Sequence, residues 1–271
     1  MQTIEELKTT NHIKIDVQGE TDNRNIPIQK VGITGVAFRS LIKLGQVELP
    51  MQGKASCYVY LASNKKGTHM SRMAIAISNY QDKLLDYKSL FELCNNLKQV
   101  LETDRVYLEL SGEVVRKKLA PVTGITGYES FNLEFDCRYE NDTFTPFLKL
   151  GITGTSLCPA SKKNSKYGAH SQRSRINLTI PFKENTDVAY LIDLVENNLS
   201  SSVYPVLKIA DEKFVTETAY ENPKFVEDIV RSIALTLKQE NYDFQSVECT
   251  NYETIHTHDA YAVIEVDTPH G

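Results

Sequence analysis

The chain has 271 residues, of which 41% are hydrophobic and 24% are charged, and its formal net charge is −5. These values are ordinary for a globular protein, and the acidic balance argues against a protein that coats nucleic acid. No segment approaches the roughly 20 apolar residues of a membrane helix, and the polar, acidic N-terminus does not look like a signal peptide. We therefore expect a cytoplasmic protein with reduced thiols and neither a nucleic-acid nor a membrane partner.

Apolar periodicity predicts both strands and helices along the chain. Strands are expected at about residues 29–39, 54–62, 70–78, 104–117, 129–138, 144–153, 173–182, 243–250 and 259–266. Apolar stripes predict helices at about 90–101, 188–199 and 225–237, the last opened by Asn222 as N-cap and Pro223. Residues 138–143 should form a hairpin turn and 161–168 a loop. Paired strands followed by grouped helices indicate an α+β fold with antiparallel sheet.

A weak internal repeat suggests a duplicated β-rich unit. Val31–Gly35 recurs as Leu150–Gly154, and the His-x-x-Arg of His69–Arg72 recurs at His170–Arg173. Each His-x-x-Arg is followed by a strand-like run and then by a helical pattern. Three matches in the same order favour duplication over chance, and we expect the two halves to meet in one continuous sheet.

Cys158 and His170 are the most chemically informative pair. Cys158 follows an apolar strand, just before Pro159, and His170 comes twelve residues later. A thiolate and an imidazole can bind a metal such as zinc or form a nucleophile pair, although a lone loop cysteine is usually only a thiol. The other cysteines fall in apolar patterns and are interpreted as core residues: Cys57, Cys94, Cys137 and Cys249.

Glu253, His256 and His258 form a second polar cluster near the end of the chain. Thr250 to Glu253 has a capping-box pattern, which predicts a short helical turn. Such a turn would direct Glu253 and His256 the same way, as chelation requires, whereas the alternative is a polar hairpin tip.

Residues 204–228 form a charged segment that leads into the third helix. Glu227 lies at the edge of that helix's apolar stripe and can accept two N–H groups of a purine, and Glu212 can supply a metal oxygen. The alternative is a solvated loop. Basic residues that could bind an oligophosphate lie near the repeated loops, although such residues are common on surfaces: Lys66, His69, Arg72, Lys162, Lys163, Lys166, Arg173 and Arg175. The chain has no P-loop, Rossmann or nucleophile-elbow motif, which argues against ordinary ATPases, dehydrogenases and α/β-hydrolases.

Seven segments in order carry a family resemblance: Gly67–Arg72, Leu157–Lys162, Ala169–Arg173, Tyr204–Lys208, Asp211–Glu217, Tyr220–Asp228 and Glu253–Ala260. Over about residues 26–266 the chain resembles the type IB GTP cyclohydrolases of prokaryotic folate biosynthesis. It departs from them at Ala160, where many members carry a second cysteine, and at Ser171, where asparagine is usual.

The resemblance implies a tunnelling fold, with a ββααββ unit in residues 1–138 and another in 139–271. Such units form barrels when subunits assemble, so a homotetramer with sites at subunit interfaces is expected. The implied reaction converts GTP and water to 7,8-dihydroneopterin triphosphate and formate. A divalent metal is implied, with Zn²⁺ or Mn²⁺ foremost and Fe²⁺ or Mg²⁺ as further candidates.

The resemblance also implies roles for individual residues. The implied metal ligands are Cys158, Glu212, Glu253 and His256, and the implied catalytic residues are Cys158, His170 and His256. Glu227 should bind the guanine edge, and the implied triphosphate contacts are Lys66, His69, Arg72 and Arg173. The alternatives are another tunnelling-fold enzyme, such as a queuosine-pathway nitrile reductase with a covalent cysteine and NADPH, or a non-catalytic purine-binding protein.

Overall fold

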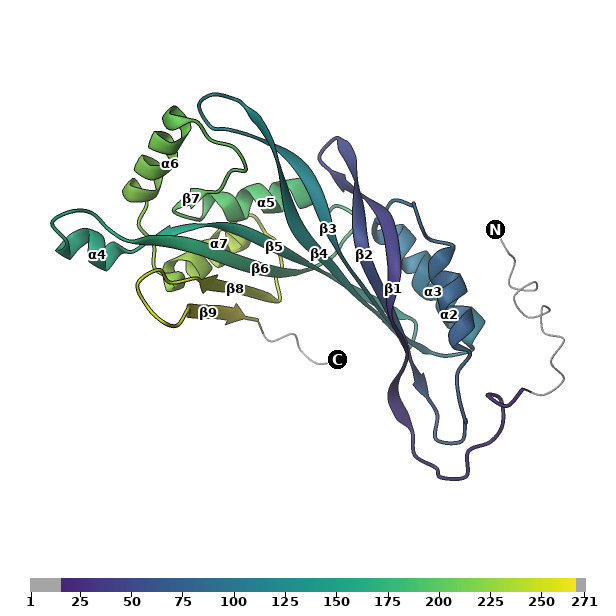
Figure 1. The fold of residues 1–271 in the computed structure, drawn as a ribbon. Helices are drawn as coiled ribbons and strands as arrows, with labels where there is room; N and C mark the ends of the chain where they lie inside the picture. Colours follow the sequence, from purple (N-terminus) through teal and green to yellow (C-terminus); the bar gives the residue numbers. More distant parts are fainter. Residues whose placement is uncertain (1–15, 267–271) are drawn as a thin grey trace.

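Long hairpins make up most of the fold, which the computed structural model describes for residues 16–266 (Figure 1). The strands are β1 (Ile28–Leu44), β2 (Val47–Leu61), β3 (Arg105–Leu119), β4 (Thr126–Glu140), β5 (Thr143–Leu157), β6 (Ser171–Pro181), β7 (Ser201–Ser202), β8 (Ser246–Asn251) and β9 (Ala260–Glu265). The helices are α2 (Met70–Ser78), α3 (Tyr87–Leu101), α4 (Pro159–Asn164), α5 (Val188–Asn197), α6 (Ile209–Glu221) and α7 (Val226–Gln239).

All strands belong to one antiparallel sheet, in the order β1-β2-β3-β4-β5-β6-β8-β9, with β7 beside β5. The two halves of the chain join where β4 pairs with β5, which confirms the expected continuous sheet. The turn between them consists of Asn141 and Asp142, both with positive φ (48° and 62°). Two-residue hairpins favour such residues because left-handed backbone matches the twist of the strands, so the hairpin turn predicted at 138–143 is confirmed.

The element order repeats as ββααββ, first in β1 to β4 and then in β5 to β9 with α4, β7 and α6 inserted. This order confirms the predicted α+β tunnelling fold, while the division at 138/139 stays a prediction. The Val31–Gly35 and Leu150–Gly154 repeats lie in the equivalent strands β1 and β5. The His-x-x-Arg repeats are not equivalent, because His69 follows β2 whereas His170 precedes β6.

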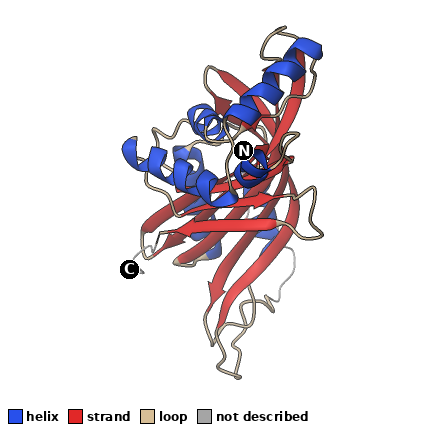
Figure 2. Cartoon of the chain, turned by 90° about the vertical axis from the view of Figure 1, so that its left-hand side faces the viewer, coloured by secondary structure: helices blue, strands red, loops and turns tan. Residues whose placement is uncertain are grey.

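Helices cover one face of the sheet and enclose the apolar core (Figures 1 and 2). In the first half, α2 packs on β1 and α3 on β3 and β4. In the second half, α5 packs on β5 and α7 on β8 and β9. The three predicted helical stripes are confirmed, and they face inward. The four cysteines assigned to the core are buried, and burial raises the pKa of Cys57 and of Cys249 to about 12.

The strand predicted at 70–78 is wrong, because these residues form α2. Its buried positions are Met73, Ala76 and Ile77, which have helical spacing, and contact with α3 and β1 selects the helix over the local β-propensity. The loop predicted at 161–168 is partly helical, since α4 occupies Pro159–Asn164 with proline in its first turn.

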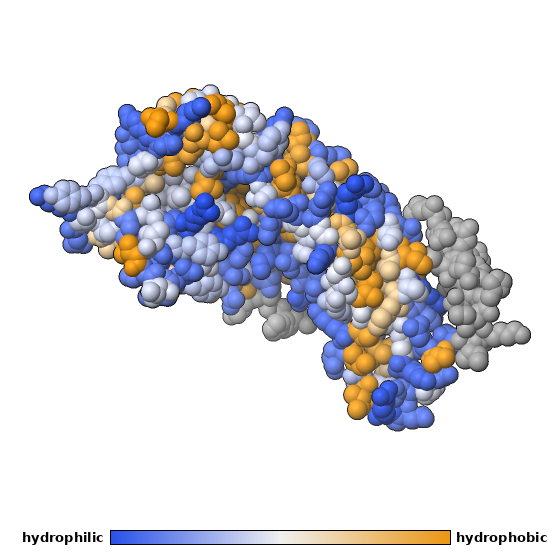
Figure 3. Space-filling view, viewed as in Figure 1, coloured by the Kyte–Doolittle hydropathy of each residue, from blue (hydrophilic) through white to orange (hydrophobic). Residues whose placement is uncertain are grey.

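The segment 204–221 contains α6, a helix that periodicity did not predict. Only Asp211 and Ala219 of α6 are buried, so its sequence has no apolar stripe. The next helix, α7, begins at Val226 rather than after Asn222, and Asn222 ends α6 instead. The exposed side of α6 carries large apolar residues, among them Ile209 and Phe214 (Figure 3).

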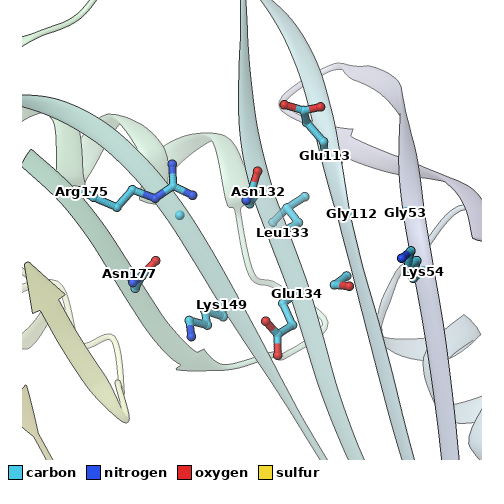
Figure 4. A pocket seen from close by; sticks show the side chains of 12 residues that line it. Gly53, Lys54, Gly112, Glu113, Asn132, Leu133, Glu134, Lys149, Arg175 and Asn177 are labelled. Carbon is cyan, nitrogen blue, oxygen red and sulfur yellow. The ribbon is translucent and has the colours of Figure 1, made fainter. Parts of the chain in front are cut away.

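The sheet face opposite the helices is polar. A groove of about 540 Å³ crosses β2 to β6 on this face, with Lys54, Glu134, Lys149 and Arg175 among its lining residues (Figure 4). Arg175 crosses over Gly151, where a side chain would collide with its guanidinium at 2.2 Å. The two faces of the sheet therefore differ, with one in the core and one open.

Candidate active site

Sheet register explains the spacing of Cys158 and His170. The β5–β6 ladder ends with Leu157 opposite Ser171, and the next residues outward are Cys158 and His170. The backbone N–H of Cys158 donates to the carbonyl of His170 at 3.1 Å. The twelve-residue interval is therefore the connection containing α4, which returns the chain to the position opposite Cys158. Cys158 is also the N-cap of α4, and its Sγ accepts from the N–H of Ser161 at 3.4 Å.

The loop between β8 and β9 brings Glu253 to His170. Tyr252 N–H donates to the carbonyl of Arg173 at 2.9 Å, and Glu253 N–H donates to Asp259 Oδ1 at 3.2 Å. These bonds turn the loop back over the end of β6, so that Glu253 Oε2 lies 3.8 Å from His170 Nδ1. Both side chains are mostly buried, with 10% and 15% exposed.

The same loop corrects one prediction about local structure. Residues 254–258 form bends, and no helical turn occurs where the capping-box pattern predicted one. The rings of His256 and His258 stack with centroids 5.1 Å apart. Glu253 and His256 still line one pocket, but long-range loop contacts and not helical geometry bring them there.

The start of α7 forms the third wall of the site. Lys224 N–H donates to the carbonyl of Leu157 at 3.0 Å, and Lys224 Nζ donates to the carbonyl of Asn198 at 2.7 Å. Burial lowers the pKa of Lys224, and nearby Asp228 offsets this only in part. Glu227 lies in the first turn of α7, where the helix dipole favours a carboxylate.

A pocket of about 290 Å³ collects five of the predicted site residues: Cys158, His170, Glu227, Glu253 and His256. It is also lined by Gln172, Lys224 and Asn251, which sequence reasoning did not assign to a site. Gln172 and Lys224 lie inside the segments Ala169–Arg173 and Tyr220–Asp228, which carry the family resemblance. These motifs could therefore have identified both residues. For Asn251, the only local signal is the alternation of side chains between the two faces of β8.

The remaining predicted residues lie outside this pocket. Glu212 is exposed on α6. His69 and Arg72 line a separate cavity of about 710 Å³ in the first half, where His69 Nε2 is 3.5 Å from Asp16 Oδ2. The last two predicted residues are Lys66, paired with Glu20, and Arg173, exposed on the open sheet face.

The donors in the pocket fit a divalent metal by type. Cys158, Glu253 and His256 supply a thiol, a carboxylate and an imidazole, which are the ligands that zinc prefers. Between residues 16 and 266 of the single chain, no three His, Cys, Asp or Glu side chains converge closely enough to hold an ion. Over the same range, no helix has the length and apolar character to cross a membrane.

The fold and the pocket together define a tunnelling-fold protein with a thiol, imidazole and carboxylate site. A family model described as type I GTP cyclohydrolase folE2 matches residues 15–262. The chain is 40% identical over 253 residues to GTP cyclohydrolase FolE2 of Cupriavidus pinatubonensis, covering 93% of each chain. It is 38% identical over 250 residues to GTP cyclohydrolase FolE2 of Neisseria gonorrhoeae, covering 92% of this chain and 97% of that one.

The chain therefore belongs to the type I GTP cyclohydrolase FolE2 family, which confirms the resemblance and the enzyme class predicted from its motifs. Among solved structures, uricase from Arthrobacter globiformis aligns with a TM-score of 0.46 and 7% identity, over 89% of this chain and 96% of that chain. At that level the likeness bears on neither function nor site.

Proposed function

We propose that this chain is a cytoplasmic, metal-dependent GTP cyclohydrolase that converts GTP and water to 7,8-dihydroneopterin triphosphate and formate, the first step of folate biosynthesis. The observation that carries the proposal is the pocket shared by Cys158, His170, Glu227, Glu253 and His256 in a chain of the FolE2 family. These residues come from four of the seven segments that carry the family resemblance, and they have the residue types that ring opening of guanine requires.

Cys158, Glu253 and His256 would hold the divalent cation, with Zn²⁺ or Mn²⁺ as the first candidates. Such a cation acts as a Lewis acid and lowers the pKa of water. Glu212, the fourth predicted ligand, lies outside the pocket in the single chain. Its participation therefore requires α6 to move or a neighbouring subunit to supply it.

His170 and Glu227 have complementary tasks in the proposed reaction. Hydration of carbon 8 of guanine requires a proton to reach the adjacent ring nitrogen, and a positioned imidazole such as His170 can deliver it. The Glu253 carboxylate lies 3.8 Å from Nδ1 of that imidazole and is mostly buried beside it. Glu227 can accept two guanine N–H groups, which fixes the ring in one orientation.

We further propose that the site is completed in a homotetramer. Lys66, His69, Arg72 and Arg173 lie outside the pocket of their own chain, so they can reach a triphosphate only from another subunit or from the rim. The end strands β1 and β9 leave two sheet edges for pairing with further copies.

The decisive assay is the fluorescence of oxidised neopterin formed from GTP, with chelator and with Zn²⁺ or Mn²⁺ added back. Cys158→Ala should lower turnover at least ~100-fold while the assembly stays intact, because it removes a ligand. Product formation that survives thorough chelation would refute the metal role, and no product with any metal would refute the reaction.

Two further variants test substrate binding and subunit sharing. Glu227→Gln should raise KM for GTP at least tenfold, whereas Glu240→Gln, at the exposed far end of α7, should leave KM unchanged.

Co-expression of Cys158→Ala with Arg72→Ala should restore activity if one subunit completes another's site. Mixed assemblies as inactive as either parent would refute the shared site.

A further inference from the structure

A buried polar pair, Ser156 and Gln172, lies directly behind His170. The two residues are opposite each other in the β5–β6 ladder, one step inward from Leu157 and Ser171. Since side chains alternate along a strand, they share a face with Cys158 and His170. Ser156 is fully buried and Gln172 is 6% exposed, so their hydrogen bonds form without competition from solvent.

The amide of Gln172 connects the buried serine to the imidazole. Its Nε2 donates to Ser156 Oγ at 2.7 Å, which turns its Oε1 toward His170 Nδ1 at 2.9 Å. Glu253 Oε2 approaches the same nitrogen, at 3.8 Å. Two acceptor oxygens beside Nδ1 favour a proton on that nitrogen. The reversed amide would instead leave an unprotonated Nδ1 facing a carboxylate.

We propose that Gln172 is a positioning residue that holds neutral His170 as the Nδ1–H tautomer and leaves the lone pair on Nε2. Within residues 16–266, Nε2 makes no hydrogen bond, and the His170 ring lines the pocket. The ring nitrogen left free to interact with a ligand in the pocket is therefore Nε2. Because Gln172 is neutral, it fixes the ring and the tautomer without adding a charge.

The tautomer can be measured without turnover, in the full chain treated with chelator. Long-range ¹H–¹⁵N correlation spectra of ¹⁵N-histidine protein report which ring nitrogen is protonated, and His170→Gln identifies the signals. We expect Nδ1–H in the wild type and in Gln172→Glu, which keeps an acceptor oxygen. Gln172→Met, similar in length but without hydrogen bonds, should lose the preference.

Ser174→Ala is the matched control, because Ser174 is a buried hydroxyl on the same face of β6 that donates to Asn251 Oδ1 at 2.6 Å and not to Gln172 or His170. It should keep the Nδ1–H signal. Ser156→Ala removes the hydrogen-bond partner of Gln172 and should weaken the preference for the Nδ1–H tautomer. If Gln172→Met does not fold, this variant tests the proposal in its place. An Nε2–H signal in the wild type, or an unchanged Nδ1–H signal in the variants that lose these bonds, overturns the proposal.

The catalytic consequence rests on the proposed function and is measured separately. Gln172→Met should lower kcat by about 10- to 100-fold with little change in KM, the usual effect of removing an orienting partner. Gln172→Glu should recover most of that loss. A wild-type protein with no cyclohydrolase activity would refute the proposed function while leaving the spectra interpretable. A normal kcat in Gln172→Met would refute the positioning role.

Discussion

Glu196 is the residue whose replacement best tests how the two halves are joined. It lies on α5 in the second half, and its carboxylate accepts from Arg116 Nη2 at 2.6 Å and Lys118 Nζ at 2.9 Å, both on β3 of the first half. Glu129 on β4 bonds the same two cations, at 2.6 and 3.1 Å. We predict that Glu196→Gln destabilises the fold by about 3–5 kcal/mol.

The magnitude follows from burial and charge count. The four side chains are only 10–18% exposed, so water screens them weakly. Two cations balance two anions in the native network, and Glu196→Gln leaves one buried positive charge without a partner. At an effective dielectric of about 20, one contact near 4 Å contributes roughly 4 kcal/mol, which agrees with the predicted loss.

The measurement is urea unfolding at one protomer concentration, since assembly also contributes to stability. Adding Lys118→Met to Glu196→Gln restores charge balance and should recover more than ~1.5 kcal/mol, which a double-mutant cycle detects. As a control, Asp243→Asn removes the exposed 2.7 Å pair with Lys183 and should cost under about 1 kcal/mol. A loss for Glu196→Gln as small as the control's would refute the reasoning.

Further predictions concern a buried carboxylate and two glycines. Burial raises the pKa of Asp211, but bonds from the N–H groups of Thr123, Lys208 and Val122 outweigh it, so the net pKa is below the ordinary range. Its ionised form therefore stabilises the fold above the unfolded pKa near ~4, and this contribution disappears as pH falls toward the native pKa. Asp211→Asn should lower the urea midpoint at pH 7, and its difference from wild type should shrink toward pH 3. Gly53→Ala should prevent folding, as followed by circular dichroism, because its Cβ would lie 1.9 Å from a backbone oxygen of β3. Gly151→Ala should fold, because the atoms nearest to its added Cβ belong to the movable end of Arg175.

Local sequence determined the elements whose signals are strong. The apolar stripes at 90–101, 188–199 and 225–237 became helices because each needs to bury one face, and the sheet provides it. Asn141 and Asp142 close a hairpin because their short side chains tolerate left-handed backbone. The family and the residue types of the site also followed from motifs that stand in order along the chain.

Tertiary contacts decided the elements with ambiguous local signals. The alternating apolar residues at 74–78 suit a strand, yet packing against α3 and β1 makes them helical. The helix α6 carries no apolar stripe. It packs on β5 and β7, and its Asp211 carboxylate accepts hydrogen bonds from the β3–β4 loop. A periodicity argument cannot detect a helix whose stabilising contacts do not follow an apolar stripe.

The geometry of the site also depended on long-range structure. The sequence supplied Cys158, His170 and Glu253 as candidates, but their proximity requires a strand register and a loop folded over the end of β6. The alignment of Ser156 with Gln172 behind His170 follows from the same register. The sequence specifies the residue types of the site. The distances between these residues depend on contacts among residues far apart in sequence, and those contacts exist only in the folded protein.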